Sequence, residues 1–248
     1  AGSGIGRATA LRFAAEGAAV LCLGRTLASL DETVAEVRAA GGTAEAFVAD
    51  ATRESDIAAA VAHCVATLGG LDIFFANAGN TDAFVPLLDQ SVEVWEQQYR
   101  DNTISAFIAV KHAGRHMKAE GRGSIILNSS TGSLRANGGT AAYASAKAGV
   151  NLLTMSAAAA LAGTGVRVNA VLPGLTETKL TKNTFDYARS KGSEAKLGAL
   201  TLMKRPGRVE DIAAVVAFLA SDDAAYVDGQ LIAADGGISA THPFGRFV

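Results

Sequence analysis

Apolar and polar positions follow two different periods along the chain. Six short runs are apolar at nearly every position and rich in Val, Ile, Leu and Phe, which predicts strands buried on both faces; they cover residues 18–24, 43–49, 71–77, 123–129, 166–172 and 229–235. Elsewhere apolar residues recur every three or four positions and predict helices at residues 7–17, 29–41, 56–69, 92–120, 141–162 and 209–220. This strict alternation predicts an α/β fold of Rossmann type, with a doubly wound parallel sheet in a three-layer α/β/α arrangement. No repeat or linker interrupts it, so we expect a single domain over residues 1–248.

The chain opens on a glycine-rich turn, "AGSGIG", directly before the predicted helix Arg7–Glu16. Gly4 and Gly6 would let the backbone approach a pyrophosphate at the positive N-terminal end of that helix. Such a turn normally follows a central strand, and no strand precedes it here. We therefore expect roughly ten further residues ahead of Ala1 in the real polypeptide, and an empty slot between the neighbouring strands without them.

The residue after the first predicted strand indicates which nicotinamide cofactor is bound. A carboxylate about 20 residues past the glycine-rich turn holds the ribose 2′-hydroxyl of NAD, whereas Arg accommodates the 2′-phosphate of NADP. Here the strand runs straight into Arg25, and no acid follows before Asp31. The sequence favours NADP(H) over NAD(H); the alternative is that Arg25 is only a solvated charge after a strand.

"AAYASAK", residues 141–147, places Tyr143 and Lys147 on one face of a predicted helix. An ammonium about 5 Å from the phenol favours the phenolate by roughly 3 kcal/mol, or about two pKa units. Tyr143 would then serve as acid in ketone reduction and as base in alcohol oxidation, while Lys147 lowers its pKa and can hold the ribose hydroxyls. Ser130, at the end of a predicted strand, would donate a hydrogen bond to the substrate oxygen. The alternative is an exposed pair worth a few tenths of a kcal/mol.

Several motifs in order resemble the short-chain dehydrogenase/reductase family, in its short single-domain branch and in the manner of 3-oxoacyl-(acyl carrier protein) reductases. They are "GSGIG", "VADAT", "ANAG", "RDNTISAF" and "PGLTET", with Ala76 where Asn is more usual, and the resemblance runs to about Gly237. It implies hydride transfer between a nicotinamide cofactor and a ketone or secondary alcohol. The implied catalytic residues are Ser130, Tyr143, Lys147 and Asn102. Ser129 competes with Ser130, but alignment on Tyr143 selects Ser130.

The resemblance also implies a set of cofactor contacts. They are Ser3, Gly4, Ile5, Gly6, Arg25, Asp50, Ala51, Asn77, Ala78, Gly79, Tyr143, Lys147, Pro173, Gly174, Thr176 and Thr178. Asp50 would meet the adenine ring and Thr178 the carboxamide, while Asn102 would tie a water to Lys147. The family is commonly tetrameric, with two long helices pairing across a dimer axis. The apolar residues from Val150 to Leu161 agree with a homotetramer or a homodimer.

Composition and charge exclude several other classes of function. The 248 residues are 49% hydrophobic and 19% charged, which suits a globular protein with a full core. A net charge of −2 without a basic stripe indicates neither nucleic acid nor an anionic membrane as partner. No apolar run reaches the roughly 18–20 residues that cross a bilayer. Cys22 and Cys64 lie in apolar patterns, which favours a reducing, cytoplasmic setting without disulfides.

A metal site is not expected. His112 and His116 have the i, i+4 spacing of metal ligands, but no third ligand is evident, so a solvated or interface helix face is the better interpretation.

The substrate is left open by the sequence. Residues 179–205 are expected to form a lid with an apolar underside, which does not decide among ketoacyl thioesters, cyclic ketones, sugars and steroids. Two alternatives remain: a non-catalytic NADP(H)-binding regulator or scaffold, and a sugar-nucleotide epimerase or dehydratase. The latter class carries a larger C-terminal region, for which this chain has no length.

Overall fold

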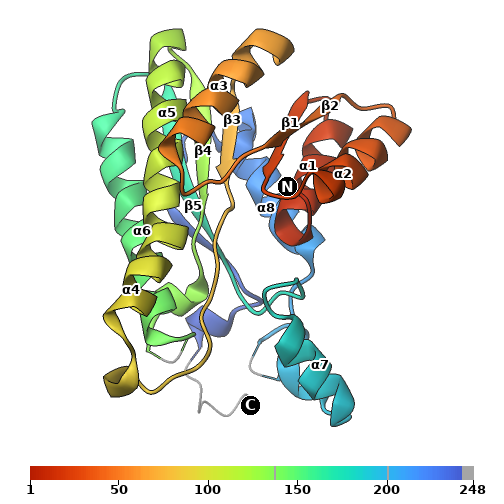
Figure 1. The fold of residues 1–248 in the computed structure, drawn as a ribbon, viewed down its shortest axis with the longest axis vertical. Helices are drawn as coiled ribbons and strands as arrows, with labels where there is room; N and C mark the ends of the chain where they lie inside the picture. The colour runs from red at the N-terminus through yellow and green to blue at the C-terminus, as the bar shows by residue number, and fades with distance from the viewer. Residues whose placement is uncertain (137, 200, 242–248) are drawn as a thin grey trace.

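A computed structural model describes residues 1–136, 138–199 and 201–241, so residue 200 of the expected lid lies outside the described residues. Strands and helices alternate along the chain (Figure 1). Within the described residues the strands are β1 (Val20–Gly24), β2 (Ala44–Val48), β3 (Ile73–Ala76), β4 (Gly123–Asn128), β5 (Val166–Pro173) and β6 (Leu231–Ala234). The α-helices are α1 (Gly4–Ala15), α2 (Leu27–Ala39), α3 (Glu54–Leu68), α4 (Val92–Gln98), α5 (Ser105–Glu120), α6 (Ala141–Ala160), α7 (Lys182–Ser190) and α8 (Val209–Ala220). All six predicted strands and all six predicted helical regions are present.

Every strand pairing in the described part of the chain is parallel, which confirms the predicted fold class. β1 pairs with β2, and β3, β4, β5 and β6 follow one another in a second, four-stranded sheet. Between β1 and β3 lies a cavity of about 430 Å³ whose walls are mostly apolar, with Phe13, Leu21 and Phe74 among them. The facing edges of β1 and β3 form no strand pairing within the described residues.

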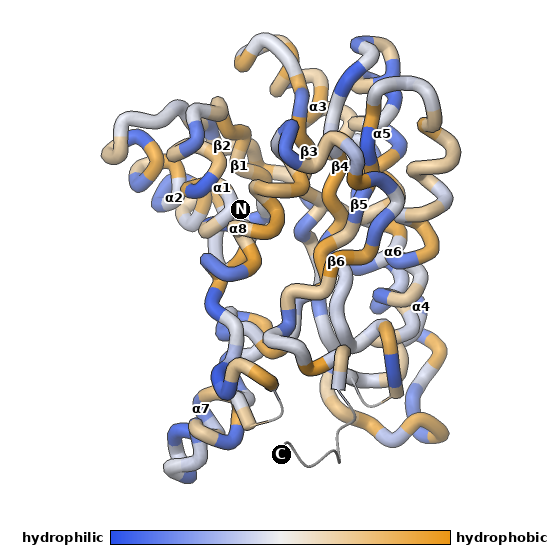
Figure 2. The backbone as a smooth tube through the Cα atoms, turned by 180° about the vertical axis from the view of Figure 1, so that it is seen from behind, coloured by the Kyte–Doolittle hydropathy of each residue, from blue (hydrophilic) through white to orange (hydrophobic). Residues whose placement is uncertain are grey.

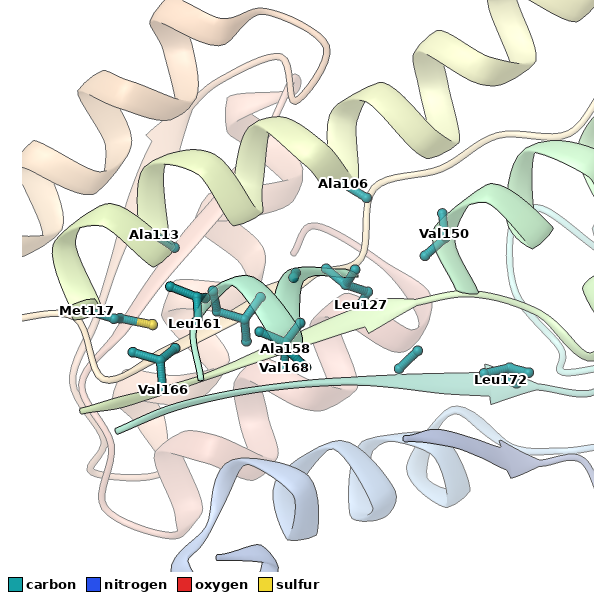
Figure 3. Close-up of a cluster of buried hydrophobic side chains, with 13 residues drawn as sticks. Ala106, Ala113, Met117, Leu127, Val150, Ala158, Leu161, Val166, Val168 and Leu172 are labelled. Atoms are coloured by element: carbon teal, nitrogen blue, oxygen red, sulfur yellow. The ribbon is translucent and has the colours of Figure 1, made fainter. Parts of the chain in front are cut away.

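The central strands are buried on both faces, as their apolar runs predict. Ile125 and Leu127 of β4 belong to one buried cluster with Met117 of α5 and Leu161. Figure 3 shows Leu127 on the side of the sheet that α5 and α6 cover. Ile126 points the other way, into a cluster built on α8 and α1. Successive side chains on a strand face opposite sides, so each side of β4 contributes to a separate core. Figure 2 shows β3 and β4 as mostly hydrophobic, in contrast to the largely hydrophilic α7.

Several helix ends differ from the sequence expectation by a few residues, and two differences from the predicted helices lie close to the site. α1 begins at Gly4 rather than Arg7, because the glycine-rich turn already forms the first helical turn, with Arg7 N–H bonded to Ser3 C=O. The predicted helix 92–120 is continuous but changes period, since a π-helical segment, Tyr99–Ile104, joins α4 to α5. α5 ends, as expected, on a glycine in the left-handed region, Gly121, with φ of 72°.

The apolar residues of α6 serve mainly the core of the chain itself. Val150, Ala157, Ala158 and Leu161 are buried against β4 and β5. Other apolar residues of this run, Leu152 and Met155, remain exposed, so only part of the apolar run is used within one subunit.

Candidate active site

The predicted site residues follow the carboxyl ends of several strands. Arg25 follows β1, Asn77 follows β3, and Ser130 lies two residues past β4. Pro173 is the last residue of β5. Because carboxyl ends of parallel strands share one edge, this edge is where an open α/β sheet binds its ligands.

A cavity of about 320 Å³ at this edge gathers the first half of the predicted cofactor contacts. Its lining includes Ser3, Arg25, Asp50, Ala51, Asn77, Ala78 and Gly79. Ser3 precedes α1 but makes no side-chain cap bond to it. The N–H groups of the first turn of α1 therefore have no partner from its cap and can bind an anion.

Close packing at the glycine-rich turn permits only small residues. Gly4 has φ of +56°, a conformation that favours glycine, and a Cβ on Gly6 would lie 2.9 Å from Asn77 Nδ2. Asn77 is fixed in turn by Asn128, whose Nδ2 donates to Asn77 Oδ1 at 2.9 Å. These features fit a dinucleotide that lies with its pyrophosphate at the N-terminus of α1 and its adenosine half toward Arg25 and Asp50.

Asp50 is held in an ionised, oriented state. Its Oδ1 accepts hydrogen bonds from the backbone N–H of Thr52 at 2.9 Å and from its hydroxyl at 2.8 Å. These bonds, with smaller contributions from the nearby charges of Arg25 and Arg53, hold the pKa of Asp50 below its ordinary value.

The second half of the predicted site lies on the loop after β5. Thr176 Oγ1 donates to the carbonyl of Gly174 at 3.1 Å, and Thr131 Oγ1 donates to the carbonyl of Pro173 at 3.2 Å. Thr178 reaches back to the glycine-rich turn, where its Cβ lies 3.4 Å from the position of a Cβ on Gly4. Thr178, Ser3 and Gly4 line a groove of about 720 Å³ beside α1, whereas Ile5 packs into the core on the α8 side of the sheet.

Tyr143 and Lys147 lie one turn apart on α6, beside Ser130. Lys147 Nζ is 5.9 Å from the centroid of the Tyr143 ring and donates to the backbone carbonyl of Asn128 at 2.7 Å. Ser130 is hydrogen-bonded to the Tyr143 hydroxyl, and its own Oγ accepts from the Gly132 N–H at 3.0 Å. Ser129 instead turns inward and donates to Asn151 Oδ1 at 2.6 Å.

Burial changes the expected ionisation of this pair. Burial raises the pKa of Tyr143, and the hydrogen bond from Ser130 only partly opposes the rise. Burial also lowers the pKa of Lys147 to about 8. The pKa of Tyr143 is thus raised, not lowered as expected, because the loss of hydration on burial is the largest effect on it.

Asn102 lies in the π-helical segment and is almost fully buried. Its Nδ2 donates to the backbone carbonyl of Asn80 at 3.0 Å, and its Oδ1 accepts from the Asn80 N–H at 3.3 Å. Asn102 Oδ1 lies 2.7 Å, and Lys147 Nζ 3.0 Å, from the position that a Cβ on Gly79 would take. The two polar groups thus face the same point, where one water can bridge them.

Sequence analysis did not single out three side chains beside this site. Gln98 contacts Asn102, and Thr140, at the start of α6, donates its hydroxyl to Asp82. Gln98 stands four residues before Asn102, a helical spacing that could have indicated it. Asp82 and Thr140 are 58 residues apart in the chain, so no local pattern joins them.

His112 and His116, which have the spacing of metal ligands, do not share a common partner. His112 Nε2 lies 3.0 Å from Glu54 Oε1, whereas His116 Nε2 is buried and makes no hydrogen bond to the described residues. In the described ranges, no three His, Cys, Asp or Glu side chains are grouped as a metal would require. Nor is any described helix long and apolar enough to span a bilayer.

Comparisons with known proteins cover nearly the whole chain. The family described as Enoyl-(Acyl carrier protein) reductase matches residues 1–239. Cis-4-hydroxycyclohexanecarboxylate dehydrogenase of Sinomonas cyclohexanicum is 38% identical over 240 residues, which is 97% of this chain and 94% of that protein.

Solved structures share the same arrangement of sheet and helices. The crystal structure of levodione reductase has a TM-score of 0.92 at 33% identity, with 97% of this chain and 95% of that chain covered. A structure from Beutenbergia cavernae, described as a candidate NAD(P)-dependent gluconate 5-dehydrogenase with NADP bound at low occupancy, has a TM-score of 0.87 at 36% identity. That match covers 97% of this chain and 94% of the other.

Proposed function

The chain belongs to the short-chain dehydrogenase/reductase family of oxidoreductases, and on this premise we propose that it transfers a hydride between NADP(H) and a ketone or secondary alcohol. The observation that carries the proposal is the grouping of Ser130, Tyr143 and Lys147 at the same sheet edge as the cavity beside α1. An anion site and a proton donor at one edge are the two elements that nicotinamide-dependent carbonyl chemistry requires.

The cofactor would lie along the carboxyl edge of the sheet. The first turn of α1 would hold its pyrophosphate, Arg25 the 2′-phosphate, and Asp50 with Ala51 the adenine end. Lys147 and Tyr143 would hold the ribose next to the nicotinamide, and Thr178 the carboxamide. When bound, the cofactor supplies the hydride in reduction or accepts it in oxidation.

Proton transfer would fall to Tyr143. The raised pKa of Tyr143 keeps the phenol protonated near neutral pH, so that it can donate a proton to the carbonyl oxygen as that oxygen gains charge. Ser130 would hold the same oxygen by a hydrogen bond, and the Lys147 ammonium would stabilise the phenolate that remains. Asn102 would hold a water that returns a proton toward Lys147 from solvent. In the oxidation direction Tyr143 must first lose its proton, which favours alkaline conditions.

The substrate pocket would be closed by the segment that contains α7. Phe185 is buried within this segment, while Tyr187 and Met203 expose most of their apolar surface. Exposed apolar side chains on a lid favour a substrate with an apolar body. The names of the relatives add cyclic alcohols and ketones to the compounds that should be tried first.

The direct test is turnover with both cofactors. Purified protein is titrated with NADPH and NADH by nicotinamide fluorescence, and then assayed on cis-4-hydroxycyclohexanecarboxylate, levodione and a ketoacyl thioester. We expect tighter binding of NADPH and turnover of at least one compound. Tight NADPH binding without turnover on a broad panel of ketones and alcohols would contradict the proposal and favour a cofactor-binding scaffold.

Arg25 is expected to determine the preference for NADP(H). Arg25 is exposed, lines the 320 Å³ cavity and forms no ion pair with the described residues. Arg25→Asp removes a charge-assisted contact to the 2′-phosphate, so NADPH should bind roughly 10- to 100-fold more weakly, while NADH binds equally well or better. The control is Arg122→Asp, the same charge change on an exposed residue directly before β4, at the end of the strand opposite to the site. Equal loss of NADPH affinity in both variants would contradict the assignment.

We also propose that two copies pair through the outer faces of α5 and α6, as a homodimer or within a homotetramer. Apolar side chains remain exposed there, including Phe107 on α5 and Leu152 on α6. The double variant Phe107→Lys/Leu152→Lys should therefore be monomeric by light scattering. The control Leu27→Lys changes a similarly exposed apolar residue on α2. A double variant with the mass of the wild-type assembly would contradict the pairing.

A further inference from the structure

Gln98 is a buried glutamine at the end of α4, one helical turn before Asn102. Gln98 is 3% exposed and Asn102 1% exposed. A primary amide carries two donor positions and one acceptor oxygen, and burying it is costly unless these are used. The burial of the Gln98 amide is therefore expected to be offset by hydrogen bonds that it makes inside the protein.

The side-chain oxygen of Gln98 is one of the groups that hold the amide of Asn102 in its orientation, together with the backbone of Asn80. Asn102 Nδ2 donates to Gln98 Oε1 at 3.1 Å and to the Gln98 backbone carbonyl at 3.0 Å. Two acceptors on one side hold the nitrogen end of the Asn102 amide toward α4. The oxygen end must then point the opposite way.

The oxygen end of Asn102 points to the surroundings of Lys147. Asn102 Oδ1 and Lys147 Nζ both lie within 3.0 Å of the position that a Cβ on Gly79 would take. A carbonyl oxygen near an ammonium is favourable, whereas an amide NH₂ in the same place would repel it. The acceptor on Gln98 thus acts with the backbone of Asn80 to keep the oxygen end of the amide on the side of Lys147.

The nitrogen of Gln98 has a free donor. Gln98 Nε2 donates to no described residue, and it is not among the described buried polar atoms that lack a partner, so water can reach it. The neighbouring π-helical segment, Tyr99–Ile104, is a feature that occurs often at functional sites. Both points agree with a water held beside Asn102.

We propose that Gln98 is a positioning residue, which helps to hold the Asn102 amide with its oxygen toward the Lys147 ammonium and thereby favours the charged form of Lys147 during proton transfer by Tyr143. The proposal rests on the proposed function. Its physical consequence for Lys147 can also be measured without turnover.

Few other titratable or charged groups near Lys147 could affect its pKa. Tyr143 lies on the same helix, Arg100 and Asp101 lie on the π-helical segment, and Asp82 lies in the loop after β3. Lys147 forms no ion pair with any carboxylate in the described ranges, and burial alone accounts for its lowered pKa of about 8. An added or removed dipole at Gln98 should therefore be seen in the titration of Lys147.

The test compares Gln98→Met with Gln98→Glu, and the control is Gln97→Met on the exposed neighbouring position of α4. Met keeps the length but has no acceptor, so turnover should fall about tenfold and the alkaline loss of Lys147 charge should move to lower pH. Glu keeps the acceptor and adds a negative charge. Turnover should be retained, with the pH profile moved up by about one unit. Gln97→Met should match the wild type.

A second readout does not depend on activity. The unfolding free energy of each variant is measured from pH 7 to pH 10, where Lys147 changes its charge in the folded protein. Opposite shifts for Met and Glu would support the proposal. Equal loss of stability in both variants with the wild-type pH dependence would reduce Gln98 to a structural residue and overturn it. If the wild type itself has no turnover, the proposed function fails, while this second readout still decides the role of Gln98.

Discussion

Replacing Tyr143 with Phe is expected to lower ketone turnover by about 10²- to 10⁴-fold, the usual contribution of a positioned general acid. The variant keeps the ring, whose surroundings include Gly139 and Lys147, and removes only the hydroxyl that Ser130 contacts. NADPH should still bind, with at most the loss of one neutral hydrogen bond to the ribose, about 0.5–1.5 kcal/mol.

The measurement is steady-state turnover together with a fluorescence titration of NADPH. Tyr226→Phe is the matched control, since Tyr226 is fully exposed and lies far from the site in the chain. A Tyr143→Phe variant that retains more than about a tenth of wild-type turnover would show that another group delivers the proton. Ser130 would then be the first residue to test, because it is the hydroxyl that contacts Tyr143.

The fold could be predicted from the sequence because the strands are apolar at successive positions, so that both of their faces are buried. Val168, Ala170 and Leu172 of β5 face the helices α5 and α6, while Val171 faces α8. A strand that is apolar at successive positions therefore belongs to a covered parallel sheet, whatever lies elsewhere in the chain. The site could be located for a similar reason, since chemistry-bearing residues directly follow these strands.

The ionisation of the site could not be predicted from local spacing. The i, i+4 relation reveals that Lys147 is near Tyr143, but it does not reveal how much water either side chain loses. That loss depends on packing between segments far apart in the sequence, such as the contact of Lys147 with the carbonyl of Asn128. The helix α7 was also not predicted from the sequence, because most of its residues are polar and only Phe185 and Ala188 are buried.

A second large effect is expected when the buried charge itself is removed. Lys147→Met should abolish proton transfer and yet make the cofactor-free protein more stable at pH 7. The folded-state pKa of Lys147 is about 8, below its ordinary value of 10.5, so folding costs free energy as long as the lysine is charged in both states. The drop from 10.5 to about 8 corresponds to about 3–4 kcal/mol, because one pKa unit is worth about 1.4 kcal/mol. The lost hydrogen bond to Asn128 offsets about 1–2 kcal/mol of this gain.

The difference in stability between Lys147→Met and the wild type should depend on pH. Below about pH 8 the wild type bears the full cost of the buried ammonium. Between pH 8 and 10.5 the unfolded chain binds the extra proton, so wild-type stability rises with pH relative to the variant. Urea unfolding should therefore show Lys147→Met more stable by about 1–2 kcal/mol at pH 7, and no more stable than the wild type near pH 10.

The control Lys118→Met, an exposed lysine near the end of α5, should leave the difference between the two pH values unchanged. A stability gap for Lys147→Met that is the same at both pH values would mean that Lys147 titrates normally, and that its charge is not what burial in this site disfavours.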